Sequence, residues 1–153
     1  MKGNIIDLIP LIVIIFAFFI GLVFALVLYN GFNDIGAFSS ISGLNDSVTQ
    51  TISVLDYSSP LLLIGLGLAS VIGAFFIRTH PIFFFVSVIL LSIVMLISTI
   101  MNNVMETFTT NPSIIGYANQ LPITSLTMQN MVIVIFGIGI AILIALYAKP
   151  GGE

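Results

Sequence analysis

Four long apolar runs dominate the chain. They cover residues 8–29, 61–77, 82–101 and 131–148, and none of them contains an Asp, Glu, Lys, Arg or His. A helix needs about 20 apolar residues, each rising about 1.5 Å, to cross the roughly 30 Å of a bilayer's hydrocarbon. We therefore predict an all-α membrane protein, in which four transmembrane helices form a bundle and residues 1–153 form one domain.

Composition points to lipid as the solvent of these runs. Apolar residues make up 59% of the chain and charged residues only 6%, whereas a soluble domain carries about a quarter charged residues.

No small-x-small cleavage site follows the first run cleanly, so we expect a retained helix rather than a secretory signal peptide.

The three basic residues predict the orientation. Lys2 precedes the first run, Arg78 lies between the second and third, and Lys149 follows the fourth. The connecting segments 30–60 and 102–130 contain no Lys or Arg. Because basic residues are retained in the cytoplasm during insertion, we expect both termini to be cytoplasmic and both long segments to face outward.

Each outward segment is expected to carry a short interfacial helix. In the first segment, apolar residues recur at helical spacing with polar residues between them, as in a helix lying on the membrane surface. These residues are Leu44, Val48, Ile52 and Leu55. In the second segment, Asn111 and Pro112 resemble a helix N-cap followed by Pro at the first helical position, and Pro122 should end that helix.

Small residues recur every four positions on three of the runs. Such a ladder leaves a groove on one helix face, so that another helix can approach closely in lipid. The nine residues are Ala17, Gly21 and Ala25, then Gly65, Ala69 and Gly73, then Gly137, Ala141 and Ala145. They predict helix packing, either within this chain's own bundle, which is the simpler reading for any one ladder, or between chains.

The chain can also be divided into two hairpins of the same plan. A shift of 72 positions aligns Gly65 with Gly137 and Gly67 with Gly139. This alignment favours a parallel internal repeat, although two glycine-rich apolar helices can also match by chance.

The residues that usually carry chemistry are scarce. Without Cys the chain has no disulfide or thiolate site, and its single His80 is read as a turn residue rather than a metal ligand. Runs without ionisable residues argue against ion-coupled carriers and proton relays. We therefore predict no enzyme activity, no cofactor, no metal site and no direct nucleic-acid site.

The third run concentrates hydroxyl and amide side chains. Ser92 and Thr99 are seven positions apart and share a helix face. We expect these hydroxyls to bond between helices or back to their own helix. A polar pathway for water or a solute is the alternative.

The second half of the chain resembles a known class of proteins. The resemblance rests on Met101-Asn102-Asn103-Val104, Phe108, Asn111-Pro112, Tyr117-Ala118-Asn119, Leu121-Pro122, Met128-Gln129-Asn130 and Tyr147-Ala148-Lys149-Pro150. Over residues 82–150, this pattern resembles small membrane proteins of bacterial and archaeal viruses. Some of those are similar to minor virion proteins of tailless icosahedral viruses with an internal lipid membrane. The resemblance implies a structural role in a virion membrane beneath a capsid.

These observations lead to three functional hypotheses. The leading one is a structural protein of a membrane, expected in a virion, whose partners are lipid, copies of itself or other membrane subunits, and capsid proteins. The second is a holin-like pore or small-solute channel. The third is a non-catalytic accessory subunit of a larger membrane complex.

Overall fold

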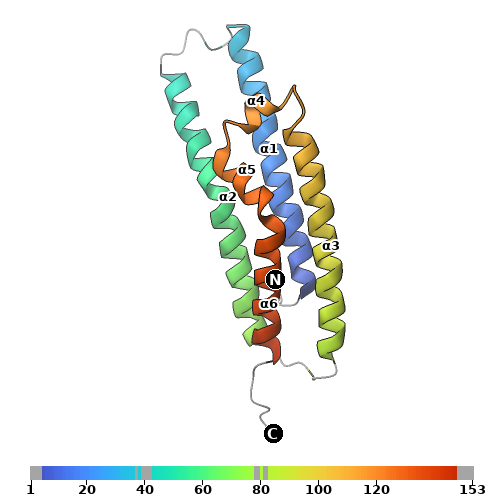
Figure 1. The fold of residues 1–153 in the computed structure, drawn as a ribbon. Helices are drawn as coiled ribbons and strands as arrows, with labels where there is room; N and C mark the ends of the chain where they lie inside the picture. The colour runs from blue at the N-terminus through green and yellow to red at the C-terminus, as the bar shows by residue number, and fades with distance from the viewer. Residues whose placement is uncertain (1–4, 37, 39–42, 78–79, 81–82, 148–153) are drawn as a thin grey trace.

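The chain folds into long, nearly parallel helices. A computed structural model describes residues 5–36, 38, 43–77, 80 and 83–147, and these are almost entirely helical. The long helices lie side by side with alternating direction, so that the start of the first and the end of the last lie at the same end (Figure 1). They are α1 Leu8–Asp34, which continues the 3-10 turn Ile5–Asp7, then α2 Leu44–Phe75, α3 Phe83–Thr109 and α6 Met131–Tyr147; the short helices are α4 Ile115–Ala118 and α5 Pro122–Gln129.

Three of these helices are individually long and apolar enough to cross a membrane. They are α1 with its preceding turn, α2 and α3. A fourth span exists if α5 and α6, which meet at a bend of 60°, count as one broken span. α6 alone has 17 residues and is therefore about 26 Å long. Three to four apolar helices of this length indicate an integral membrane protein.

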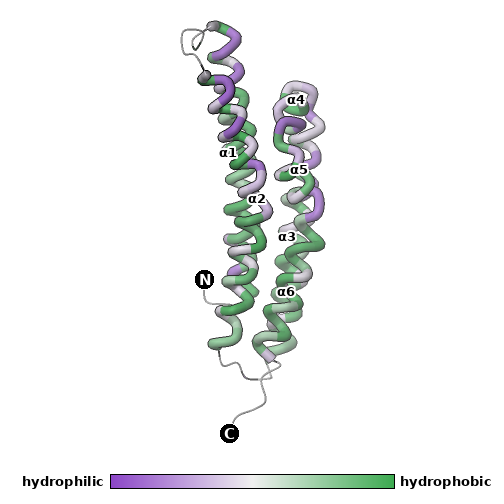
Figure 2. The backbone as a smooth tube through the Cα atoms, turned by 90° about the vertical axis from the view of Figure 1, so that its left-hand side faces the viewer, coloured by the Kyte–Doolittle hydropathy of each residue, from purple (hydrophilic) through white to green (hydrophobic). Residues whose placement is uncertain are grey.

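Hydrophilic residues gather at one end of the bundle. Figure 2 shows them at the far end of α1, in the first half of α2 and around α4 and α5, whereas the other parts of the helices are mostly hydrophobic. We call the described residues of segments 30–59 and 102–130 the polar crown. α2 has 32 residues and is about 48 Å long, well beyond the roughly 30 Å of hydrocarbon. The crown end of α2 therefore extends out of the apolar layer.

The prediction of a separate interfacial helix in the first segment is wrong. Its apolar residues, from Leu44 to Leu55, form the first turns of α2, which continues through Pro60 without a break. Ile52 and Leu55 pack against the hydrophobic core instead of lying on a membrane surface. The helical spacing is confirmed, but the apolar side of this part of α2 packs against α1 rather than against a membrane surface.

The helix starts in the second segment also differ from the expected ones. Asn111 does not cap a helix at Pro112: its side-chain oxygen accepts the N–H of Ser113 at 2.9 Å in a turn, and α4 begins only at Ile115. Pro122 does not end the preceding helix, since α4 already ends at Ala118. It begins α5 at the first helical position, where its missing N–H costs nothing.

Two buried glycines allow α6 to pack between α2 and α3. A Cβ added to Gly67 of α2 would lie 2.5 Å from Cδ1 of Ile138, which belongs to α6. A Cβ on Gly139 of α6 would collide with the side chain of Leu91, which belongs to α3. Each glycine thus forms a hole that receives a branched side chain of the next helix.

The same two glycines are equivalent under the shift of 72 positions. Gly67 and Gly139 are both closely packed, whereas Gly65 and Gly137 both have nothing within 4 Å of an added Cβ. The two hairpins therefore use these four positions alike. They differ nearer the crown, where α2 is continuous but α5 and α6 are bent apart.

These contacts predict different outcomes for two neighbouring glycines. Gly139→Leu should lower the free energy of unfolding by about 1–3 kcal/mol, because a packed core is overfilled. Gly137→Leu, with open space around it, should stay within about 0.5 kcal/mol of the parent. Unfolding by SDS in mixed micelles, followed by circular dichroism, measures both. Equal destabilisation by the two variants would contradict the packing described.

Candidate functional site

The small-residue ladder of α1 faces away from the bundle. Ala17, Gly21 and Ala25 are all exposed, and a Cβ on Gly21 would have nothing within 4 Å. The opposite face of α1 carries the buried side chains, among them Phe19 and Val23. At its centre, Gly21, this ladder therefore packs against none of the described residues.

The other two ladders are divided between the surface and the interior. Gly65 and Ala69 are exposed and Gly73 is half-buried on α2, whereas Gly137 is exposed, Ala141 half-buried and Ala145 buried on α6.

The close packing of α2 uses a different set of small residues, which the sequence reasoning missed. Ser59, Gly67, Ser70 and Ala74 are buried on one face. Their spacing is as helical as that of the ladder, so periodicity could have found them. It could not tell which of the two faces turns inward.

The residues used to predict orientation, Lys2, Arg78 and Lys149, lie outside the described residues. The start of α1, the end of α2, the start of α3 and the end of α6 share one end of the bundle (Figure 1). Which side of the membrane this end faces stays a prediction.

The hydroxyls of the third run do not share one interior path. Ser92 donates to the carbonyl of Val88 at 3.1 Å and Thr99 to that of Met95 at 2.9 Å, and both side chains are exposed. The hydroxyl of Ser87 lies 3.0 Å from that of Tyr147 and joins α3 to α6. Ser98 is buried, and its hydroxyl has no hydrogen-bond partner among the described residues.

The most unusual polar group is Asp56, a carboxylate only 4% exposed on α2. Its Oδ1 accepts the N–H of Thr124 at 2.7 Å, and its Oδ2 accepts the N–H of Ile123 at 3.1 Å. Both donors belong to the first turn of α5, which has no side-chain cap of its own. An acidic side chain is favourable there, because the first N–H groups of a helix are unpaired and its N-terminus carries partial positive charge. Asp56 therefore caps α5 from another helix.

The main chain of Asp56 takes part in the same junction. Pro60 lies four residues further along α2 and has no N–H, so the carbonyl of Asp56 lacks its usual helical donor. The hydroxyl of Thr124, a fully buried residue, donates to this carbonyl at 3.1 Å. α2 and α5 thus complete each other's hydrogen bonds across 68 positions of sequence.

We call this arrangement of Asp56, Pro60, Ile123 and Thr124 the α2–α5 junction. Sequence reasoning treated Asp56 only as an acidic residue of an outward segment. One signal could have pointed to it: an Asp placed four residues before a Pro within a helical pattern, where the Pro frees its carbonyl.

The junction holds α2 and α5 together through these hydrogen bonds. Each carboxylate oxygen of Asp56 accepts a main-chain N–H, and its carbonyl oxygen accepts the hydroxyl of Thr124. Within the described ranges, no three His, Cys, Asp or Glu side chains come together as a metal site requires. What the junction can do is fix where α5 sits and hence the bend that leads into α6.

Comparison of the chain with protein-family models, curated proteins and solved structures returned no match.

The cap predicts a local effect of Asp56→Asn. An amide offers one oxygen acceptor instead of two, so one buried N–H of α5 loses its partner, at a cost of about 1–3 kcal/mol. Hydrogen exchange at the amides of Ile123 and Thr124 should accelerate by at least about tenfold. Asp46→Asn, which changes an exposed carboxylate of the same helix, should leave those two amides unchanged. Unaltered exchange in Asp56→Asn would contradict the cap.

The role of Pro60 predicts coupling between two substitutions. Thr124→Val removes the hydroxyl that serves the carbonyl of Asp56, whereas Pro60→Ala restores the helical N–H to that carbonyl. Thr124→Val should therefore destabilise the Pro60→Ala protein less than the parent, by about 0.5–1.5 kcal/mol. A double-mutant cycle of SDS unfolding measures the difference, and strict additivity would count against the exchange of donors.

Proposed function

We propose that this chain is a non-catalytic structural protein of a membrane, which packs side by side with further copies of itself. The observation that carries the proposal is the exposed ladder on α1. Gly21 lies at its centre with open space around it, and the exposed Ala17 and Ala25 extend it by one turn in each direction.

Packing in lipid explains why such a face would be used. Lipid chains are as apolar as leucine, so helices associate through close van der Waals contact rather than by escape from water. A face of small side chains lets a second backbone approach nearer than the neighbouring exposed residues, such as Phe24 at 61% exposure, would permit. An isologous pair could bring α1 of one copy against α1 of another.

The resemblance of residues 82–150 to minor virion proteins supplies one setting for this role. In that setting the chain would lie in many copies in a virion membrane beneath a capsid. This part of the proposal rests on the resemblance alone. Genes for a capsid protein and a packaging ATPase beside the gene for this chain would support it.

Self-association is tested with one substitution and a matched control. The chain has no Cys, so Asn119→Cys, at an exposed position of the crown, gives a single labelling site. In liposomes, energy transfer between labelled copies should be present for the parent. Gly21→Leu should weaken association by on the order of tenfold, because the bulky side chain separates the backbones.

Gly137→Leu is the control, since it adds the same side chain at an exposed position outside the α1 ladder. It should leave energy transfer unchanged. The proposal would be contradicted if energy transfer in the parent did not exceed the level expected from random proximity in the membrane. Equal energy transfer in the parent and in Gly21→Leu would also contradict it. Co-purification of the parent with large unrelated membrane subunits, without self-association, would favour an accessory subunit instead.

A further inference from the structure

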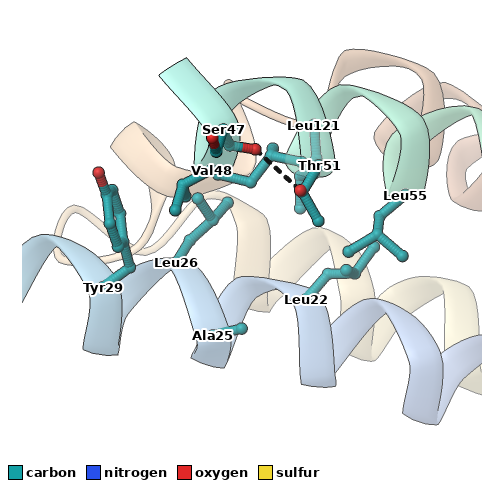
Figure 3. Close-up of a pocket in the computed structure, with 10 residues that line it drawn as sticks. Leu22, Ala25, Leu26, Tyr29, Ser47, Val48, Thr51, Leu55 and Leu121 are labelled. Atoms are coloured by element: carbon teal, nitrogen blue, oxygen red, sulfur yellow. Dashed lines mark hydrogen bonds between the residues drawn. The ribbon is translucent and has the colours of Figure 1, made fainter. Parts of the chain in front are cut away.

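The concave sites toward the crown end differ in what they offer a ligand. A groove between α1 and α2 is lined mostly by apolar side chains, such as Leu22, Val48 and Leu55 (Figure 3). A cleft between α3 and α5 is instead lined by many polar side chains, including the carboxylate of Glu106. We call it the α3–α5 cleft. Its volume is about 350 Å³, which falls within the range of about 300–1,000 Å³ for small-molecule sites.

The hydroxyls of the α3–α5 cleft are left as hydrogen-bond acceptors. Thr109, Thr110 and Ser125 line the cleft, and each donates its hydroxyl proton to a main-chain carbonyl, at 2.9, 2.8 and 3.2 Å respectively. Because a hydroxyl has only one proton, its lone pairs are what remains for a ligand. The ionised carboxylate of Glu106 also accepts hydrogen bonds and donates none. The cleft therefore suits a ligand that is rich in donors.

Charge narrows this class of ligand to an organic cation. Glu106 is exposed on the wall of the cleft, and the described part of the chain includes no Lys or Arg that could pair with it. One carboxylate balances a single positive charge, so a divalent metal ion, whose affinity depends on the charge of its ligands, would keep an excess. Met105 and Met128, both buried, also line the cleft and offer apolar contact to carbon atoms. A primary ammonium on a carbon chain, with three N–H donors, matches both kinds of lining.

The cleft lies where two apolar runs end. Asn102 directly follows the run 82–101, Gln129 lies two positions before the run 131–148, and both line the cleft. The edge of the hydrocarbon is therefore expected at the base of the cleft, where phospholipid headgroups begin. An ethanolamine headgroup carries its ammonium beside a phosphate, to which the side-chain amides of Asn102 and Gln129 can donate.

We propose that the α3–α5 cleft binds a primary ammonium group through Glu106. Its position favours the headgroup of an ethanolamine phospholipid as the source of that group, and a soluble amine is the other source of the same chemistry. This binding is independent of the self-association proposed above, since no residue of the α1 ladder lines the cleft.

Binding is tested on the full chain in mild detergent. Native mass spectrometry counts the lipids bound in parallel titrations with dioleoylphosphatidylethanolamine, dioleoylphosphatidylcholine and dioleoylphosphatidylglycerol. The ethanolamine lipid should bind most tightly, because the choline headgroup has no N–H donor and the glycerol headgroup has no positive charge. Glu106→Gln should weaken its binding by about tenfold, since a charge-assisted hydrogen bond is lost.

Asp46→Asn is the matched control. It removes the same charge from an exposed carboxylate of the crown that does not line the cleft, so binding of the ethanolamine lipid should equal that of the parent.

A lysine built into the cleft gives a second test. Thr110 lies four positions after Glu106, so the new side chain in Thr110→Lys can reach the carboxylate and should weaken binding of the ethanolamine lipid by at least about tenfold. Thr107→Lys adds the same charge at an exposed position outside the cleft. Because neighbouring helical residues do not face each other, it should leave binding unchanged.

Calorimetric titration with ethanolamine distinguishes the two sources of the ammonium group. Binding of the lipid alone assigns the group to a headgroup, whereas binding of ethanolamine that is lost in Glu106→Gln assigns it to a soluble amine. The ammonium site would be ruled out if neither ligand bound more weakly to Glu106→Gln than to the parent. Binding of the glycerol lipid as tight as that of the ethanolamine lipid, without binding of ethanolamine, would rule it out as well.

Discussion

Buried main-chain polar groups must find hydrogen-bond partners within the protein, because no water reaches them to replace a missing bond. The α2–α5 junction meets this constraint at two defects at once. Pro60 leaves a carbonyl of α2 without its donor, and the start of α5 leaves N–H groups without acceptors. The carboxylate of Asp56 on α2 accepts the N–H groups of α5, and the hydroxyl of Thr124 on α5 donates to the carbonyl on α2. The bent approach to α6 depends on this exchange, since it holds α5 against α2.

Below the junction, small residues decide how near the helices come. Gly67 admits Ile138, and Gly139 admits Leu91, so α6 can pack between α2 and α3. On α1, no side chain of the described residues packs against Gly21 in this way. Glycine thus lies in the packed interior on α6 but on the exposed surface of α1. This asymmetry is what makes α1 the candidate face for a second copy.

The sequence predicts the helices better than it predicts their rotation. An uncharged apolar run in lipid forms a helix, because a helix pairs all of its main-chain polar groups within the segment. Accordingly, α1, α3 and α6 begin within one residue of the expected starts. Spacing gives the period of a pattern but not which face turns inward, so the ladder residues Gly65 and Gly137 proved exposed. The cap at Asp56 joins residues 67 and 68 positions apart, and local patterns carry no information about such a pair.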